Sequence, residues 1–327
     1  MIGNIDIKPV LYGLKKAGIF ASSIEILAQG RNSLVVKLSD DNGKHYSLKF
    51  YKPANQFDPR PRQKSESIFL SYAKLCDLKN VPILLHEEQK ENWSLLGWLE
   101  GCHPKTIDTQ KINQIVEFMQ KINAPEGRLE AKRMGICIAS EAYINAVEAA
   151  KSILNKALNI SWENHQEDDH YTAKTRKLFE ECLLPKIRSE ADILANKKDE
   201  QHWKDDSLCA IISPSDVGIH NTIENNGNLY FLDFEYAGFD DLSKFYADWT
   251  MQPNYIFSEE QKKIFKQFLC TEVSKNNCSW VKRYRDIAKI NHLKWCVLMI
   301  KGKTKGDDPE ENYKRIHNYY KQGENIS

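Results

Sequence analysis

Short apolar segments with the length and spacing of strands occupy the first hundred residues. They lie at residues 23–28, 33–38, 45–51, 81–85 and 93–99. Between the second and third segments, Asn42-Gly43 favours a tight hairpin turn, because this pair tolerates the positive φ angles that such a turn needs. Ahead of them, residues 9–20 carry apolar side chains at steps of three and four, which predicts a helix.

After residue 100 the apolar positions recur with the helical period. One buried helix face is marked by Ile112, Ile115, Val116, Met119 and Ile122. Further helices are predicted at residues 140–158, 172–195, 258–274 and 283–301, with another beginning at 239–242. Because the pattern changes near residue 98, we predict two parts, residues 1–97 and residues 98–327.

Two apolar runs in the second part each lead to an acidic residue. Residues 209–212 precede Asp216, Asn221 follows five positions later, and residues 229–232 precede Asp233. An amide and a carboxylate are hard oxygen ligands that suit Mg²⁺ on nucleotide phosphates. A carboxylate that is free of metal can orient a hydroxyl and accept its proton. The alternative is two ordinary strands joined by a polar turn, with solvated acidic residues.

This arrangement resembles the catalytic centre of the aminoglycoside phosphotransferases and choline kinase-type small-molecule kinases. The matching residues are Asp216, Asn221, Asp233, Phe234 and Glu235. The resemblance implies a protein-kinase-like, two-lobed α+β fold, with a small antiparallel β-sheet in the N-terminal lobe and a mostly helical C-terminal lobe. It also implies that Asp216 is the catalytic base and that Asn221 and Asp233 are metal ligands. Pro214 departs from the pattern, because the family has a histidine there.

The resemblance also assigns residues that bind the nucleotide. Lys49, inside the apolar segment 45–51, matches the family's phosphate-binding lysine, and Glu66 matches the glutamate that holds this lysine. A lysine in such a segment is costly to bury without an anion. The alternative is an edge-strand lysine and a glutamate that both face water. The turn over the phosphates and the hinge near adenine complete the predicted set with Gly30, Asn32, Ser33, Trp98 and Leu99.

Composition narrows the classes of function. The chain has 327 residues and a formal net charge of +1, which gives no global field for nucleic acid or an anionic membrane. The 8 cysteines include no Cys-x-x-Cys pair, so neither a zinc site nor a disulfide framework is indicated. No apolar stretch approaches the length of a membrane span. We therefore expect a cytoplasmic protein with no nucleic-acid or membrane partner.

Three further features concern the acceptor, the catalytic loop and a second possible site. Carboxylates at Glu235, Asp240 and Asp241 follow the metal aspartate and favour a cationic or polyhydroxylated acceptor. Asp248 is expected to brace the backbone of the catalytic loop, as an aspartate does in the family. Residues 163–170 mix histidines with acids, and we interpret them as a solvated acidic loop rather than a metal site.

The predicted function is ATP- and Mg²⁺-dependent transfer of a γ-phosphoryl group to the hydroxyl of a small molecule, such as an amino alcohol, an aminoglycoside or a sugar-like compound. The alternative is a pseudokinase, a nucleotide-binding regulatory protein without turnover, which Pro214 and the glycine-poor turn favour. A protein kinase is disfavoured because no Ala-Pro-Glu follows Asp233. A phosphate-loop kinase is excluded because Gly-x-x-x-x-Gly-Lys-Ser/Thr does not occur.

Overall fold

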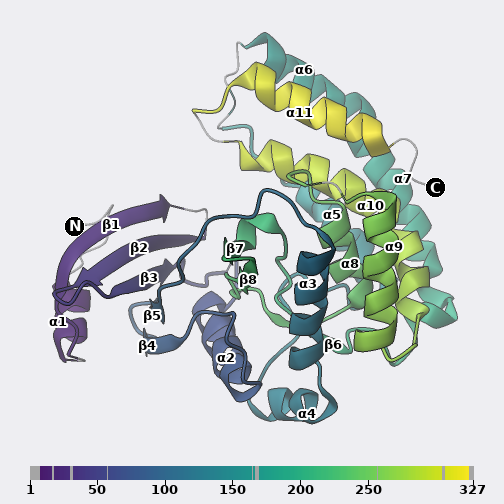
Figure 1. Ribbon diagram of the computed structural model, residues 1–327. Coiled ribbons are helices and arrows are strands. Elements are labelled where there is room, and N and C mark those ends of the chain that lie inside the picture. Colours follow the sequence, from purple (N-terminus) through teal and green to yellow (C-terminus); the bar gives the residue numbers. More distant parts are fainter. Residues whose placement is uncertain are drawn as a thin grey trace.

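The computed structural model describes residues 8–16, 18–29, 32–56, 58–163, 165, 169–255, 257–303 and 306–323. In this part of the chain the N-terminal strands form one sheet, and the remainder is mostly helical with two small two-stranded sheets (Figure 1). No helix of the described residues is long and apolar enough to cross a membrane. The expected division into an N-terminal sheet and a mostly helical C-terminal part is confirmed.

The N-terminal sheet is fully antiparallel, with strand order β1-β2-β3-β5-β4. Its strands are β1 (Ala21–Gln29), β2 (Ser33–Asp40), β3 (His45–Tyr51), β4 (Leu84–Glu88) and β5 (Trp93–Gly97). Helix α1 (Lys8–Lys16) packs Val10 and Leu14 against one face, with Leu48 and Phe50 of β3 in the same core. Because side chains alternate along a strand, Lys49 points to the other face, away from α1.

Helix α2 (Arg62–Leu75) follows β3 and carries Glu66, which is 1% exposed. The helix buries Phe69, Leu70 and Tyr72 in the core that surrounds the catalytic loop. Tyr72 donates a hydrogen bond of 2.6 Å to the carbonyl of Ile122, which ties α2 to the helical part. These contacts fix α2, and with it Glu66, against the C-terminal part.

Nine helices are described in the C-terminal part. They are α3 (Thr109–Ile122), α4 (Pro125–Arg133), α5 (Ala146–Leu158), α6 (His170–Leu178), α7 (Leu184–Ala195), α8 (Leu242–Thr250), α9 (Glu259–Phe268), α10 (Ser279–Gly302) and α11 (Pro309–Gln322). A five-residue π-helix at Phe179–Leu183 joins α6 to α7, and another at Leu269–Val273 extends α9.

The sequence pattern missed α4 and α11 and misplaced one strand. Helix α4 buries only Ala131, and α11 buries only Ile316, Tyr319 and Tyr320, so neither presents a broad apolar stripe. Strand β4 begins at Leu84, three residues later than the segment 81–85 suggested, because Val81 lies in the core of the C-terminal part instead. Apolar character alone does not show whether a buried residue such as Val81 belongs to a strand or to the core outside the sheet.

Four short strands flank the predicted site residues Asp216, Asn221 and Asp233. Strand β6 (Ile211–Ser213) pairs with β9 (Gly238–Asp240), and β7 (Thr222–Asn225) pairs with β8 (Asn228–Phe231), both antiparallel. On the other edge of β6, the buried side chain of Asn123 accepts from the N–H of Ile212 at 2.7 Å and donates to its carbonyl at 2.9 Å. One amide side chain therefore takes the place of a third strand beside β6.

Replacing Asn123 by alanine should destabilise the fold by about 2 kcal/mol or more, because two buried backbone groups of Ile212 lose their partner. Urea unfolding, followed by circular dichroism, measures this loss. The matched control is Gln120→Ala, in the last turn of α3, which Asn123 caps; Gln120 is exposed and its side chain makes one exposed hydrogen bond, so this change should alter stability by about 0.5 kcal/mol or less. Equal stability of the Asn123 variant and the wild type would contradict the inferred role.

Candidate active site

Asp216 lies in a tight loop that directly follows β6. Ser215 has a φ of +69°, in the left-handed region, and its N–H is held by the hydroxyl of Ser213 at 2.9 Å. A non-glycine residue in this region costs free energy, and such strain is concentrated at functional sites. The side chain of Asp216 is 39% exposed, and His220 Nε2 lies 3.2 Å from its Oδ1. The carboxylate is thus accessible to a ligand.

Asn221 is positioned between the two carboxylates of the predicted site. Its amide nitrogen donates to the carbonyl of Asp216 at 3.0 Å, which leaves the amide oxygen for a ligand. The backbone carbonyl of Asn221 accepts a hydrogen bond of 2.9 Å from the N–H of Leu232, just after β8. Asp233, the next residue, is therefore held close to Asn221. The loop brings together Asp216, Asn221 and Asp233 without a long connection.

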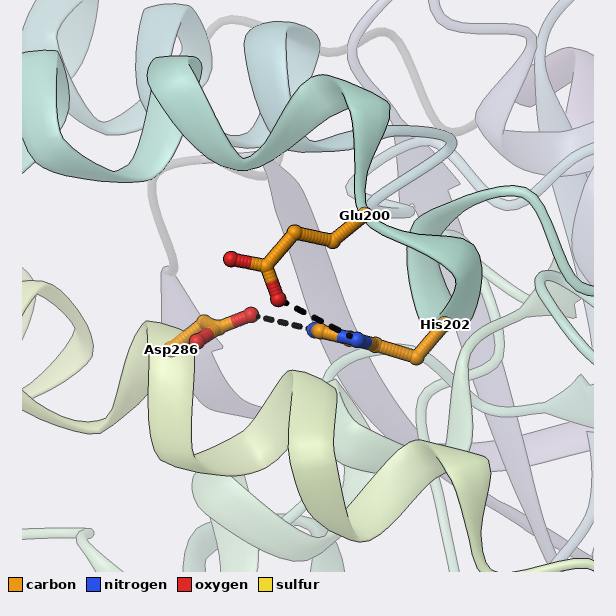
Figure 2. Close-up of side chains that lie close together, drawn as sticks. All are labelled: Glu200, His202 and Asp286. Carbon is orange, nitrogen blue, oxygen red and sulfur yellow. Dashed lines mark hydrogen bonds and ion pairs between the residues drawn. The ribbon is translucent and has the colours of Figure 1, made fainter.

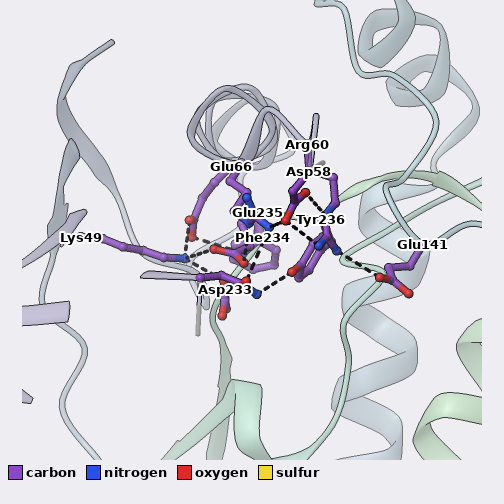
Figure 3. A network of polar contacts seen from close by, with 11 residues as sticks. Lys49, Asp58, Arg60, Glu66, Glu141, Asp233, Phe234, Glu235 and Tyr236 are labelled. Atoms are coloured by element: carbon purple, nitrogen blue, oxygen red, sulfur yellow. Dashed lines mark hydrogen bonds and ion pairs between the residues drawn. The ribbon is translucent and has the colours of Figure 1, made fainter. Parts of the chain in front are cut away.

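Lys49 lies among three carboxylates (Figure 3). Its Nζ is 2.6 Å from Glu66, 2.7 Å from Asp233 and 3.7 Å from Glu235. Burial alone would lower the pKa of Lys49, but Asp233 and Glu66 raise it well above its ordinary value, so the ammonium stays charged. The residue is 4% exposed, which excludes a lysine that faces water.

The segment after β8 is fixed to α2 by a bond and a stack. The N–H of Phe234 donates to Glu66 at 3.2 Å, and the ring of Phe234 stacks on Phe69 with centroids 4.3 Å apart. Asp233 itself has a φ of +62°, so like Ser215 it is one of the eight described non-glycine residues in the left-handed region. Asp233 therefore points into the cleft in a conformation that α2 maintains.

The three carboxylates that were expected beside the acceptor lie elsewhere. Glu235 is 2% exposed and faces Lys49 and Arg62, the latter at 3.6 Å. Burial and the neighbouring Asp233 raise the pKa of Glu235 to about 7. Asp240 and Asp241 are wholly buried and pair with Lys244 and Arg283. The expectation that these three carboxylates are available to bind the acceptor is therefore wrong.

The backbone of the catalytic loop is braced by Lys244, not directly by Asp248. Lys244 donates to the carbonyl of Ser215 at 2.7 Å, and Asp248 lies 2.9 Å from Lys244 and 2.6 Å from Lys294. Burial raises the pKa of Asp248, but the two lysines outweigh it and lower the pKa to about 2. The structural reason is the i, i+4 spacing on α8, which places Lys244 between Asp248 and the loop.

We expect Asp248→Asn to cost about 3–5 kcal/mol of stability, because it leaves Lys244 and Lys294 buried without this carboxylate. Chemical unfolding measures the loss, and the second change Lys294→Met should restore part of it. Asp192→Asn, at an exposed position of α7, is the control for the chemical change and should be neutral. A stable Asp248 variant would show that the loop is held by other contacts.

The residues predicted to contact phosphates and adenine are placed as follows. Gly30 lies outside the described residues. Asn32 donates to the hydroxyl of Tyr236 at 2.6 Å, across the cleft, and Ser33 begins β2. Trp98 and Leu99 follow β5, and the Nζ of Lys37 lies 4.6 Å from the centre of the Trp98 ring. The roles of these residues remain predictions.

A cavity of about 730 Å³ adjoins Asp216. It extends between the catalytic loop, α5 and α10, and its lining includes Arg60, Tyr236 and Trp295. Arg60 stacks on Tyr236 at 5.0 Å and binds Asp58 through Nε at 2.6 Å (Figure 3). Sequence analysis missed Asp58, Arg60 and Tyr236. The only local signal was the dense charge in Asp58-Pro-Arg-Pro-Arg62.

A second polar cluster lies on the far side of α10. Glu200, His202 and Asp286 could each offer one ligand atom to a metal (Figure 2). Lys197, however, lies 2.8 Å from Glu200 and 3.8 Å from Asp286, and Trp203 donates to Asp286 at 2.8 Å. This cluster is explained as an ion-pair network that anchors the segment after α7 to α10.

The histidine-rich loop at 163–170 is described only in part. His165 is 5% exposed and donates through Nε2 to the carbonyl of Ile300 at 3.3 Å. The expectation that this loop is solvated is therefore wrong for His165. Asp169 caps α6 by accepting from the N–H of Thr172 at 2.8 Å. Residues 164 and 166–168 lie outside the described residues.

The residues present fit a divalent cation bound to nucleotide phosphates. Three carboxylates surround Lys49, with Arg62 near only one of them, and the Oε2 of buried Glu235 has no hydrogen-bond partner. Asp233 keeps 34% of its side chain exposed, and the amide oxygen of Asn221 is available beside it. Hard oxygen donors in a region of excess negative charge suit Mg²⁺.

Comparison with solved structures shows the fold. Spectinomycin phosphotransferase in complex with ADP and spectinomycin aligns with a TM-score of 0.65 and 11% identity, covering 99% of this chain and 99% of that chain. Choline kinase from Cryptosporidium parvum aligns with a TM-score of 0.61 and 14% identity, covering 98% and 95%. Choline kinase from Streptococcus pneumoniae aligns at 0.59 and 15%, covering 96% and 98%. No family model and no curated protein matches the sequence. The protein-kinase-like fold implied by the resemblance is thus confirmed.

Proposed function

We propose that the protein transfers the γ-phosphoryl group of ATP to a hydroxyl of a small molecule, with Mg²⁺ as cofactor. One observation carries this proposal: buried Lys49 contacts both Glu66 of α2 and Asp233, while Asp216 is exposed at the edge of a separate cavity. The fold shared with small-molecule phosphotransferases supports it. Residues 1–97 form the nucleotide-binding lobe in this proposal, and residues 98–327 carry the catalytic loop and the acceptor site.

Each side chain has a role that its surroundings allow. Lys49 binds phosphate oxygens, and Glu66 keeps its ammonium aimed into the cleft. Asn221 and Asp233 hold Mg²⁺, which when bound neutralises negative charge on the transferred group. Gly30, Asn32 and Ser33 lie on the phosphate side, and Trp98 and Leu99 at adenine, as the resemblance implies.

Asp216 acts as the base. Its exposed carboxylate orients the acceptor hydroxyl and takes its proton, while the hydroxyl oxygen bonds to the γ-phosphorus and the bond to the β-phosphate oxygen breaks. The products are a phosphate ester and ADP. Rigid placement of both reactants supplies much of the rate, and the loop contacts to Lys244 and Asn221 provide that rigidity.

The experiment is a measurement of ADP release with ATP and Mg²⁺ across neutral, amino and acidic hydroxyl compounds. ADP release that depends on the acceptor supports the proposal. A second candidate, a nucleotide-binding regulator without turnover, is favoured by Pro214 at the position of the family's histidine. Calorimetry distinguishes the two, because a regulator binds ATP but releases no ADP with any acceptor.

A further inference from the structure

The cavity beside Asp216 has an unusual charge pattern for a site that would bind amines. Its charged lining consists of Arg60, Lys156, Lys244, Lys294, Lys301, Asp58, Glu141, Asp216 and Asp248. Five of these side chains are cationic and four are carboxylates. The sign of the bound group depends on which of these charges remain available to it.

Every carboxylate of this lining except Asp216 is contacted by two cations. Asp58 is contacted by Arg60 and Arg62, Glu141 by Arg60 and Lys156, and Asp248 by Lys244 and Lys294. An ammonium group entering the cavity would have to compete with a cation already in place. A third cation beside such a carboxylate is repelled by the two that already contact it, so these three carboxylates disfavour amines.

Of the four lining cations that contact these carboxylates, two keep a substantial part of the side chain exposed. Arg60 and Lys156 keep 31% and 21% of their side chains exposed, whereas Lys244 and Lys294 keep 3% and 6%. Arg60 uses three N–H groups on Asp58 and Glu141, and a guanidinium has five. Both cations contact Glu141, which lies between them at 3.2 Å from Arg60 and 2.5 Å from Lys156. Their remaining N–H groups can therefore bind one further anion together.

The rest of the lining suits hydroxyl groups. Ser140, Ser152, Asn155 and Asn159 offer neutral donors and acceptors beside the two cations. The Arg60 guanidinium carbon lies over the ring of Tyr236, 5.0 Å from its centre, which adds a cation–π contact that helps to hold Arg60 in place. Asp216 lies at the same cavity and is the one carboxylate of this lining that no lysine or arginine contacts among the described residues; its neighbour is His220.

We propose that the acceptor is a polyhydroxylated small molecule with an anionic group, a carboxylate or a phosphate, which Arg60 and Lys156 bind while a hydroxyl reaches Asp216. This inference rests on the proposed function. It deepens that function by naming the class of acceptor, and it contrasts with amino alcohols and aminoglycosides. A doubly contacted site of this kind binds planar carboxylate and tetrahedral phosphate oxygens alike.

The test compares four kinds of acceptor on the wild-type protein: sugar acids, sugar phosphates, neutral sugars and amino sugars. ADP release gives kcat and KM, and calorimetry without nucleotide gives binding. We expect the anionic sugars to give the highest kcat/KM. The comparison of sugar acids with sugar phosphates then shows whether the site prefers a carboxylate or a phosphate group. The inference is overturned if anionic sugars neither bind nor react, or if a neutral or amino sugar is preferred.

Variants assign the effect to the cavity. Lys156→Met should raise KM for the preferred anionic sugar about 10-fold or more, since a charge-assisted hydrogen bond is lost. Lys151→Met, at an exposed position of the same helix α5, is the matched control and should leave KM unchanged. An unchanged KM in the Lys156 variant also overturns the inference. If ATP itself fails to bind the wild type, the proposed function fails, which is a separate outcome from a preference for amines.

Discussion

Asp216→Asn should lower turnover by about two to four orders of magnitude while ATP affinity stays close to that of the wild type. The amide keeps the shape of the side chain but loses the charge that orients the hydroxyl and accepts its proton. Lys49 and Asp233 are on other segments and keep their contact of 2.7 Å, so nucleotide binding should be preserved. Paired measurements of ADP release and ATP binding by calorimetry test this expectation.

Asp206→Asn is the control for the chemical change, because Asp206 is exposed in the loop before β6. It should leave both measurements unchanged. Equal turnover of the Asp216 variant and the wild type would remove Asp216 as the base. Loss of ATP binding and stability together would instead assign Asp216 to the structure of the loop. A regulator without turnover would bind ATP in both forms and release no ADP in either.

Lys49→Ala should weaken ATP binding and slow turnover by about two orders of magnitude or more, since a buried cation aimed at phosphate is removed from a water-poor site. The structure adds a second expectation. Lys49 lies within 3.7 Å of Glu66, Asp233 and Glu235, so its loss leaves three carboxylates without their shared cation. We therefore expect reduced stability without nucleotide as well.

Calorimetry with ATP and thermal unfolding measure the two effects of Lys49→Ala. Lys52→Ala provides the matched control, because Lys52 is exposed just beyond β3. Its affinity, rate and stability should equal those of the wild type. Unchanged ATP affinity and turnover in the Lys49 variant would contradict the assignment of Lys49 to phosphate.

The sequence predicted the elements that have a strong local pattern. Strand β3 has the bounds that its apolar segment indicated, and the hairpin at Asn42-Gly43 is present. Helices α4 and α11 were missed because each buries too few residues, one and three, to give an apolar stripe along the helix. The fold class followed from the order of strands and helices together with the resemblance, and it is confirmed.

The candidate site was predictable in its main residues but not in the contacts that hold them. Lys49, Glu66 and Asp233 were singled out by type and order, and the structure brings them into contact. The pairing of Lys244 with the catalytic loop and of Arg60 with Tyr236 was not foreseen. Such contacts join residues that are far apart in the chain, and the sequence around a lysine or an arginine carries no local pattern that identifies its partner.

Arg62 is the one buried side chain that contacts carboxylates of both sites within the described residues: it binds Asp58 at the acceptor cavity, and its Nε lies 3.6 Å from Glu235, beside Lys49. A change of charge near Lys49 and Glu235, such as the binding of ATP, therefore alters the strength of the ion pair between Arg62 and Asp58. Thermodynamic linkage requires the converse to hold with the same free energy. ATP and the acceptor should consequently bind cooperatively, each changing the other's dissociation constant by one common factor.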